Sequence, residues 1–205
     1  MPLFSYHTTQ KGLAMPKLPG RKQFMALLDG HMSEDEALRV RCAYVLAKVA
    51  HQGQLRDSGE RYFDHPKAVA LILIDLGVYD WEMLALALDH DAVEDTDLRD
   101  SELYRLLFGD WFVEALMTLS KNQTPDYMAG LWAADGRVLM VKLADRLHNV
   151  TTLYGVTPEK RLRKLTETQR EYLPLLDHLH DIVSNEYKAA AKELDNQLRQ
   201  ALAAA

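Results

Sequence analysis

The sequence has few of the residues that mark secreted, membrane or nucleic-acid-binding proteins. It contains a single cysteine, Cys42, so it can form neither an internal disulfide nor a cysteine-rich zinc site. Its formal charge is −6 at pH 7, and the lack of a basic excess argues against nucleic acid as the main partner. It has no uncharged apolar stretch of about 18 residues and no signal-like apolar N-terminus, so we expect no membrane span. These absences favour a cytoplasmic protein that binds a small molecule.

The residues that are present suffice for one apolar core. Hydrophobic residues make up 48% of the chain and charged residues 26%, as in ordinary globular proteins. We expect an N-terminal extension at 1–30, a main domain at 31–180 and a C-terminal helix at 181–205 packed on that domain. Residues 1–28 contain no acid, and we interpret them as a loosely ordered tail rather than an organellar transit peptide.

Nearly every local signal is helical, which predicts an all-α fold. Ser33 followed by Glu36 is a capping box, and it predicts a helix over 34–53. The inner side of this helix is expected to carry Leu38, Val45, Leu46 and Val49, and Cys42 is expected to be a small core residue. His65-Pro66 predicts a second helix that ends near Gly77. Further helices are expected over 80–95, 101–108, 111–121 and 137–154, and from Thr157-Pro158 onward with a division near Pro174.

One segment, ALALDHDAVEDT, brings a histidine and several carboxylates together inside an apolar helix. Because His90 and Glu94 are four residues apart, as are Asp91 and Asp95, each pair would stack on one face of a single helix. Such groups perturb one another's ionisation unless a cation is present. The pattern therefore indicates a divalent metal.

Two other polar residues complete a set of metal ligands. His65 begins one helix and Asp145 lies in VKLADRLHN, so the expected ligands are His65, His90, Asp91 and Asp145. Two imidazoles and two carboxylates suit Mn, Fe or Zn rather than Ca. A metal with open positions can lower the pKa of bound water to about 7, as hydrolysis of a phosphate ester requires. Each residue alone would be an ordinary solvated group, and the interpretation depends on their order on separate helices.

The order His, His-Asp, Asp resembles the motif of the HD phosphohydrolase superfamily. More specifically, AHQGQLRDSGERYFDHPKAVA, HDAVEDT and VKLADRLHNVTTL resemble the hydrolase domain of the RelA/SpoT alarmone enzymes over most of the chain. The resemblance implies a compact helical HD-domain fold. It also implies a stand-alone small alarmone hydrolase, which converts (p)ppGpp to GDP or GTP and pyrophosphate.

The resemblance further implies roles for single residues. It implies Mn2+ on the four ligands, and it implies that Glu94 and Asp95 orient the attacking water and handle protons. These two carboxylates lie one turn from ligand residues, so they can reach metal-bound water. Contacts with the nucleotide are implied for Arg56, Ser58, Asn149, Thr152 and Tyr172. The planar guanidinium of Arg56 is suited to stacking on a base.

Some residues depart from the family pattern and leave other functions open. Asp57 stands where a basic or neutral residue is usual, so an adenosine alarmone is an alternative substrate. NADPH or a nucleoside monophosphate is another. A nucleotide-binding protein without catalysis is an alternative of a different class, although the intact ligand set with Glu94 and Asp95 favours an enzyme. Candidate cations for the substrate phosphates are Lys142, Arg146, Lys160 and Arg161.

Overall fold

The computed structural model describes residues 18–95, 101–123 and 126–205. Within these ranges the chain is helical and forms no strand, apart from an isolated bridge between Leu55 and Arg61. The predicted all-α class is therefore confirmed. The α-helices are α1 (Arg21–Ala26), α2 (Glu34–Ala50), α3 (Asp64–Asp75), α4 (Trp81–Asp89), α5 (Ala92–Asp95), α6 (Ser101–Phe108), α7 (Asp110–Leu119), α8 (Tyr127–Ala133), α9 (Gly136–Thr151), α10 (Pro158–Glu167), α11 (Leu173–Ile182) and α12 (Lys188–Ala204).

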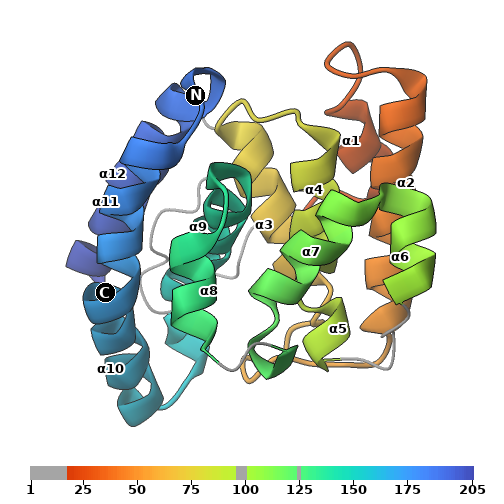
Figure 1. Ribbon diagram of the computed structural model, residues 1–205. Helices are drawn as coiled ribbons and strands as arrows, with labels where there is room; N and C mark the ends of the chain where they lie inside the picture. The colour runs from red at the N-terminus through yellow and green to blue at the C-terminus, as the bar shows by residue number, and fades with distance from the viewer. Residues whose placement is uncertain (1–17, 96–100, 124–125) are drawn as a thin grey trace.

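Three buried helices form the centre of the fold. In Figure 1, α3, α4 and α9 lie between α2 and α6 on one side and α10, α11 and α12 on the other. Every residue of α3 from His65 to Ile74 is buried, as are those of α9 from Val138 to His148. A helix that is apolar on all sides is stable only inside a protein. The polar residues of these helices are therefore held in the interior.

Helix ends follow the chemistry of the sequence. The Ser33 hydroxyl accepts a hydrogen bond from the Glu36 backbone N–H, and the Glu36 carboxylate accepts one from the Ser33 backbone N–H, which confirms the predicted capping box. Thr157 caps α10 with Pro158 in its first turn, which confirms the predicted helix start. These caps fix where α2 and α10 begin.

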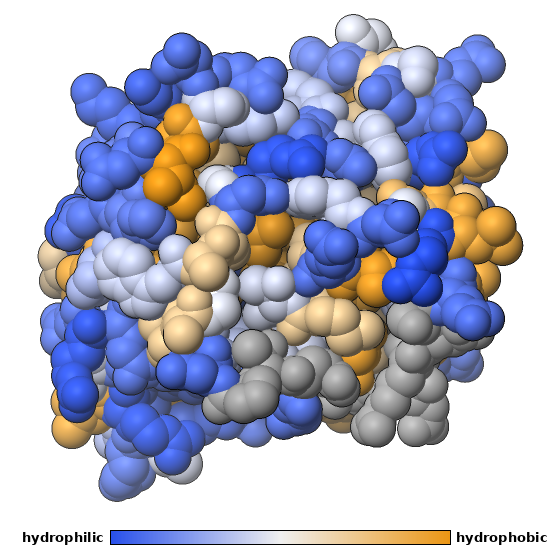
Figure 2. All heavy atoms as spheres, viewed as in Figure 1, coloured by the Kyte–Doolittle hydropathy of each residue, from blue (hydrophilic) through white to orange (hydrophobic). Residues whose placement is uncertain are grey.

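The predicted inner face of α2 is wrong for three of its four residues, whereas Leu46 is partly buried against the core. Leu38, Val45 and Val49 are 54%, 40% and 62% exposed, and the buried residues are Val40, Ala43, Tyr44 and Ala47. This second set also has the spacing of one helix face, and its alanines let α2 approach α4 closely. Cys42 is only partly buried against the core. Apolar surface gathers along the edge of the molecule where α2 and α6 lie (Figure 2).

The predicted single helix over 80–95 is also wrong, because the helix is interrupted. α4 ends at Asp89, His90 and Asp91 form a turn, and α5 begins at Ala92. The stacking of side chains four apart on one continuous helix therefore does not hold across His90 and Asp91. Near Pro174 the chain does not break: a π-helical turn at Thr168–Tyr172 leads directly into α11, where proline is tolerated in the first turn.

The two ends of the described chain pack on the rest of the domain. Phe24 of α1 is fully buried and contacts Tyr44 of α2, so residues 18–30 are anchored to the core and are not a loose tail, while residues 1–17 of the predicted tail lie outside the described residues. Helix α12 packs on α9 and α11 and buries Leu194 and Leu198. In the part of the chain that the structure describes, no helix is long and apolar enough to cross a membrane.

Candidate metal centre and adjoining pocket

The four expected metal ligands come from three central helices and meet at one point. His65 opens α3, His90 and Asp91 form the turn after α4, and Asp145 lies in α9. His65 Nε2 is 3.1 Å from Asp145 Oδ1 and 3.4 Å from Asp91 Oδ2. His90 Nε2 is 3.3 Å from Asp91 Oδ1 and 3.7 Å from Asp145 Oδ1. Two imidazole nitrogens and two carboxylates therefore face one small volume.

The orientation of His90 shows that this volume fits a cation. The Ala87 carbonyl can only accept a hydrogen bond, so His90 Nδ1, 2.8 Å away, carries the proton. This leaves a lone pair on Nε2, and Nε2 is buried without a hydrogen-bond partner among the described residues. A buried lone pair that faces carboxylate oxygens is costly unless a proton or a metal ion lies between them. The set of donor atoms fits a divalent transition metal.

The electrostatics of the cluster agree with this fit. Burial disfavours a charged His90, but the Asp91 and Asp145 carboxylates outweigh burial and raise the pKa of His90 to about 9. Burial also opposes ionisation of Asp145, yet Lys142, His65 and His90 hold the pKa of Asp145 well below its usual range. A proton on His90 thus takes the place that a metal ion would fill.

Both carboxylate ligands are held by neighbouring side chains. The Tyr62 hydroxyl donates to Asp91 Oδ2 at 3.0 Å. Asp145 Oδ2 accepts from Lys142 Nζ at 2.8 Å, and Asp145 Oδ1 accepts from Asn149 Nδ2 at 2.5 Å. Partners of this kind fix the direction in which a ligand atom points. In the sequence, Lys142 was a candidate only for a phosphate contact, and no pattern indicated Tyr62.

His148 contacts the remaining expected ligand, His65, and it was not among the residues expected at the site. His148 Nδ1 lies 2.8 Å from His65 Nδ1. Burial, with His65 and Arg56 nearby, lowers the pKa of His148 well below its ordinary value, so this ring is neutral. A signal was available, because positions 145, 148 and 149 share one face of a helix. A residue three positions after an expected ligand was thus a candidate to support it.

A pocket adjoins the metal centre and contains most of the expected nucleotide contacts. Its cavity of about 120 Å3 is lined by Arg56, Ser58, Asn149 and Thr152 among others. Arg56 Nη2 donates to Asn149 Oδ1 at 2.8 Å. Gly155 allows the wall to close, because a Cβ atom there would lie 2.5 Å from the Ser58 Cβ. Residues far apart in the sequence therefore form one recess beside the metal ligands.

The charge of this pocket is mainly positive. Arg56, Lys160 and Lys164 line it together with a single acid, Asp57. Lys160 forms an ion pair with Asp57 and lowers the pKa of that carboxyl. Asp57, the residue that departs from the family pattern, therefore lines the pocket, and Lys160 partly neutralises its negative charge. The remaining positive charge suits an anionic ligand.

The other expected site residues lie elsewhere. Tyr172 is 1% exposed and does not line the pocket, and its ring lies 3.6 Å below the Arg146 guanidinium. Arg146 also pairs with Glu167 at 3.0 Å. The backbone of Glu94 and Asp95 forms the end of α5, but the structure does not describe their side chains.

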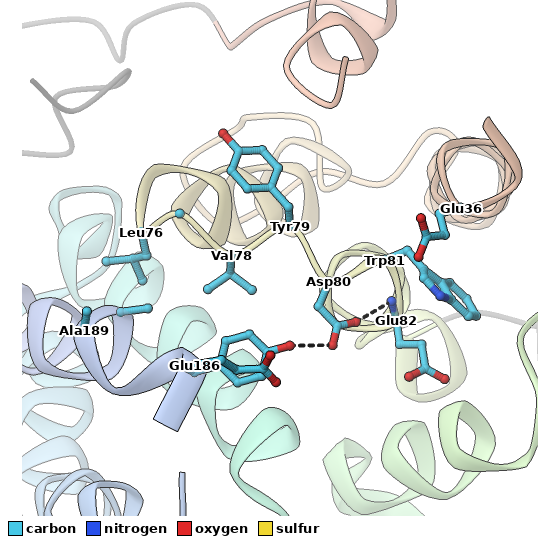
Figure 3. A pocket seen from close by; sticks show the side chains of 12 residues that line it. Glu36, Leu76, Val78, Tyr79, Asp80, Trp81, Glu82, Glu186 and Ala189 are labelled. Atoms are coloured by element: carbon cyan, nitrogen blue, oxygen red, sulfur yellow. Dashed lines mark hydrogen bonds between the residues drawn. The ribbon is translucent and has the colours of Figure 1, made fainter. Parts of the chain in front are cut away.

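A larger hollow, of about 620 Å3, lies at the other end of α4 and does not fit the same chemistry. Figure 3 shows it between α4 and the segment that leads into α12. Its acidic lining residues are Glu36, Asp80, Glu82 and Glu186. Their charge disfavours a phosphorylated ligand, and none of the expected site residues lies there.

Comparisons with known proteins identify the family of the chain. The HD domain family model matches residues 43–182. The bifunctional (p)ppGpp synthase/hydrolase SpoT of Escherichia coli K12 is 39% identical over 166 residues, which are 75% of this chain and 23% of SpoT. A probable guanosine-3′,5′-bis(diphosphate) 3′-pyrophosphohydrolase of Synechocystis is 40% identical over 163 residues, 71% of this chain and 21% of the relative. The chain thus spans less than a quarter of the length of these relatives.

A solved structure supports the fold. It is described as a metazoan ortholog of SpoT that hydrolyses ppGpp and plays a role in starvation responses, and it matches with a TM-score of 0.62. The match covers 82% of this chain and 96% of that one, at 24% identity. The compact helical HD-domain fold and the resemblance to the RelA/SpoT proteins, both expected from the sequence, are confirmed.

Proposed function

The chain belongs to the HD domain family, and from that premise we propose that it hydrolyses the 3′-pyrophosphate of guanosine tetraphosphate or pentaphosphate. One observation carries the proposal: the metal-binding atoms of His65, His90 and Asp145 lie within 4.8 Å of one another beside a cationic pocket. Asp91, which faces both histidines, is the fourth proposed ligand. Relatives named for this reaction support the same substrate.

The proposed cofactor is Mn2+, held by the two imidazoles and the two carboxylates. This mixed nitrogen and oxygen set suits Mn, Fe or Zn, and the resemblance favours manganese. The ion would supply Lewis acidity to water and to a phosphoryl oxygen. The protein's part is to aim four ligand atoms at one point through fixed outer contacts, from Tyr62, His148 and Lys142 among others.

The proposed reaction is attack by water on the phosphorus atom that carries the 3′ oxygen. A bond forms between water oxygen and phosphorus, the bond from phosphorus to the 3′ oxygen breaks, and the 3′ oxygen receives a proton. The products are GDP or GTP and pyrophosphate. Glu94 and Asp95 are the proposed residues that orient the water and move its proton, because α5 begins directly after Asp91.

The pocket supports recognition of the nucleoside. Arg56 presents a planar guanidinium on which a base can stack, and Ser58, Asn149 and Thr152 surround it. Tyr172 is proposed to act indirectly, because its buried ring supports Arg146 from below. Arg146 is the proposed phosphate contact, and in the described structure its guanidinium is buried and paired with Glu167.

A product assay tests the proposal. Purified protein loaded with Mn2+ should release pyrophosphate from ppGpp, and Asp145→Ala should not. The panel should include ppApp and NADPH, because the Asp57 carboxylate lines the pocket and can accept hydrogen bonds from either purine. Activity on another nucleotide alone would reject the substrate and leave the metal centre standing. Tight nucleotide binding without turnover would favour a non-catalytic binding protein.

A further inference from the structure

Arg56 is bonded to two consecutive residues that each hold a metal ligand. Its Nη1 lies 3.3 Å from His148 Nδ1, which in turn lies 2.8 Å from His65 Nδ1. Its Nη2 donates to Asn149 Oδ1 at 2.8 Å, and Asn149 Nδ2 donates to Asp145 Oδ1 at 2.5 Å. One guanidinium thus starts two hydrogen-bonded bridges that end on two different ligands.

Donor and acceptor chemistry fixes the direction of the first bridge. A guanidinium can only donate, so the Arg56 contact requires that His148 Nδ1 carry no proton, and its single lone pair is shared between His65 at 2.8 Å and Arg56 at 3.3 Å. His65 Nδ1 must then be the donor in its own contact with that atom. The lone pair of His65 is therefore left on Nε2, the atom that faces Asp91 and Asp145.

The same reasoning fixes the second bridge. Because Asn149 accepts from Arg56 through its oxygen, its amide nitrogen is turned toward Asp145. That bond holds Asp145 Oδ1, the oxygen that faces His65 and His90. A flipped amide would place two donors together at one end and two acceptors at the other, and would break both contacts.

We propose that Arg56 is a positioning residue for the metal, so that the nucleoside pocket and the metal centre are coupled through His148 and Asn149. The coupling to a nucleoside rests on the proposed function, whereas the positioning of the ligands does not. Arg56 lines the pocket directly, so a base that stacks on it would hold the bridging geometry. By linkage, each ligand would then raise the protein's affinity for the other.

The sign of one mutational effect separates this role from simple electrostatics. Arg56 is a cation close to a cation site, so its removal should tighten Mn2+ binding if charge alone mattered. If Arg56 positions the ligands, its removal weakens Mn2+ binding, because His65 and Asp145 lose their supports. Changes to such outer partners typically lower metal affinity about 10- to 100-fold.

The experiment is a calorimetric titration of metal-stripped protein with Mn2+ in the absence of nucleotide. Arg56→Met is expected to weaken binding about 10- to 100-fold. Lys160→Met is the matched control, since it removes one positive charge from the same pocket but not a bridge. Its affinity should equal or exceed that of the wild type. Mn2+ binding by Arg56→Met that is as tight as wild type would overturn the proposal.

A pair of substitutions at His148 tests the bridge itself. His148→Asn retains an acceptor near the position of Nδ1 and should keep Mn2+ affinity within a few-fold. His148→Leu removes the acceptor and should weaken it as Arg56→Met does. Thermal midpoints of the metal-free variants separate lost positioning from lost folding. Equal affinities for the two variants, both folded, would contradict the bridge.

The coupling is tested with guanosine, which has no phosphate to bind the metal itself. Saturating guanosine should tighten Mn2+ binding to the wild type and leave Arg56→Met unchanged. Guanosine that binds without any effect on Mn2+ affinity would refute the coupling. Guanosine that does not bind would refute the coupling, the pyrophosphate-release assay would still decide the substrate, and the titrations without nucleoside would still decide the positioning role.

Discussion

Helix α4 carries a polar cluster at each of its ends, and the two clusters differ in how their atoms are matched. At the N-terminal end, Asp80 Oδ1 accepts from the backbone N–H groups of Glu82 and Met83. Asp80 Oδ2 accepts from the Tyr187 hydroxyl at 2.8 Å (Figure 3) and faces Arg137 at 3.4 Å. Every carboxylate oxygen of Asp80 thus has donors supplied by the protein.

At the C-terminal end, roughly 13 Å away along a nine-residue helix, acceptor atoms meet without enough donors. His90 Nε2 is buried and has no hydrogen-bond partner among the described residues, and the oxygens of Asp91 and Asp145 face it. A matched cluster is complete without a ligand, whereas converging acceptors need a cation. The contrast identifies which charged cluster is structural and which is functional.

The largest effect should follow from removing a ligand at the C-terminal end. Asp145→Ala leaves two imidazoles without the carboxylate that both face, so both metal occupancy and pyrophosphate release should be lost. Metal content by mass spectrometry and a product assay measure the two quantities. Glu82→Gln, a change in the acidic hollow, is the control and should retain full occupancy. A metal-loaded Asp145→Ala protein would contradict the assigned ligand set.

A smaller effect should follow from changing proton transfer while the metal stays bound. Glu94→Gln keeps the size of the side chain and all four proposed ligands, so metal content should be unchanged. Loss of a general acid or base typically lowers the rate by about 10²- to 10⁴-fold. Single-turnover rates at fixed Mn2+ measure this loss. A wild-type rate would show that the role belongs to another residue.

The pH dependence of Mn2+ affinity tests whether His90, at the C-terminal end of α4, is a metal ligand. The pKa of His90 is raised to about 9 by Asp91 and Asp145 against the effect of burial. Metal and proton compete for this nitrogen, so Mn2+ affinity should rise about tenfold per pH unit up to about pH 9. Above that pH it should level off. Titrations between pH 6.5 and 8.5 that show no slope would mean that His90 is not a ligand.

The sequence predicted which polar side chains converge better than it predicted what surrounds them. The order of His65, His90-Asp91 and Asp145 was sufficient to expect their convergence, because each residue interrupts an apolar segment where a polar group needs a partner. The break between α4 and α5 was not visible, because ALALDHDAVEDT contains no proline or glycine to end a helix. The helix is interrupted at the turn formed by His90 and Asp91, and no helix-breaking residue marks that turn in the sequence.

Residues that support other residues were harder to predict. The contact of Tyr62 with Asp91 joins residues 29 positions apart, and no local pattern indicates it. The helix face that His148 shares with Asp145 was a local signal, but its contact with His65, 83 positions away, was not. The inner face of α2 failed for a different reason. Val40 and Ala43 compete with Leu38 and Val45 for the core, and close packing against α4 favours the smaller residues. The spacing of apolar residues alone therefore predicted the wrong face.

The smallest effect is expected at the N-terminal end of α4, and it should appear in stability alone. Arg137 lies 2.6 Å from Glu82, and its guanidinium lies 3.9 Å from the centre of the Trp111 ring. Arg137→Met removes both contacts, so the free energy of unfolding should fall by about 1–2 kcal/mol. Asp80 keeps its backbone donors and the Tyr187 hydroxyl, which limits the loss.

Urea denaturation of Arg137→Met measures this loss, and Arg105→Met is the matched control. Arg105 pairs with Asp110 on the surface with half of its side chain exposed, so its removal should cost about 0.5 kcal/mol or less. Mn2+ affinity should be unchanged in both variants, because neither arginine contacts a metal ligand or its supports in the described structure. A weakened metal site in Arg137→Met would mean that α4 transmits strain from one end to the other. The two clusters would then be parts of one functional unit, and the distinction between a matched and an unmatched cluster would no longer separate structure from function.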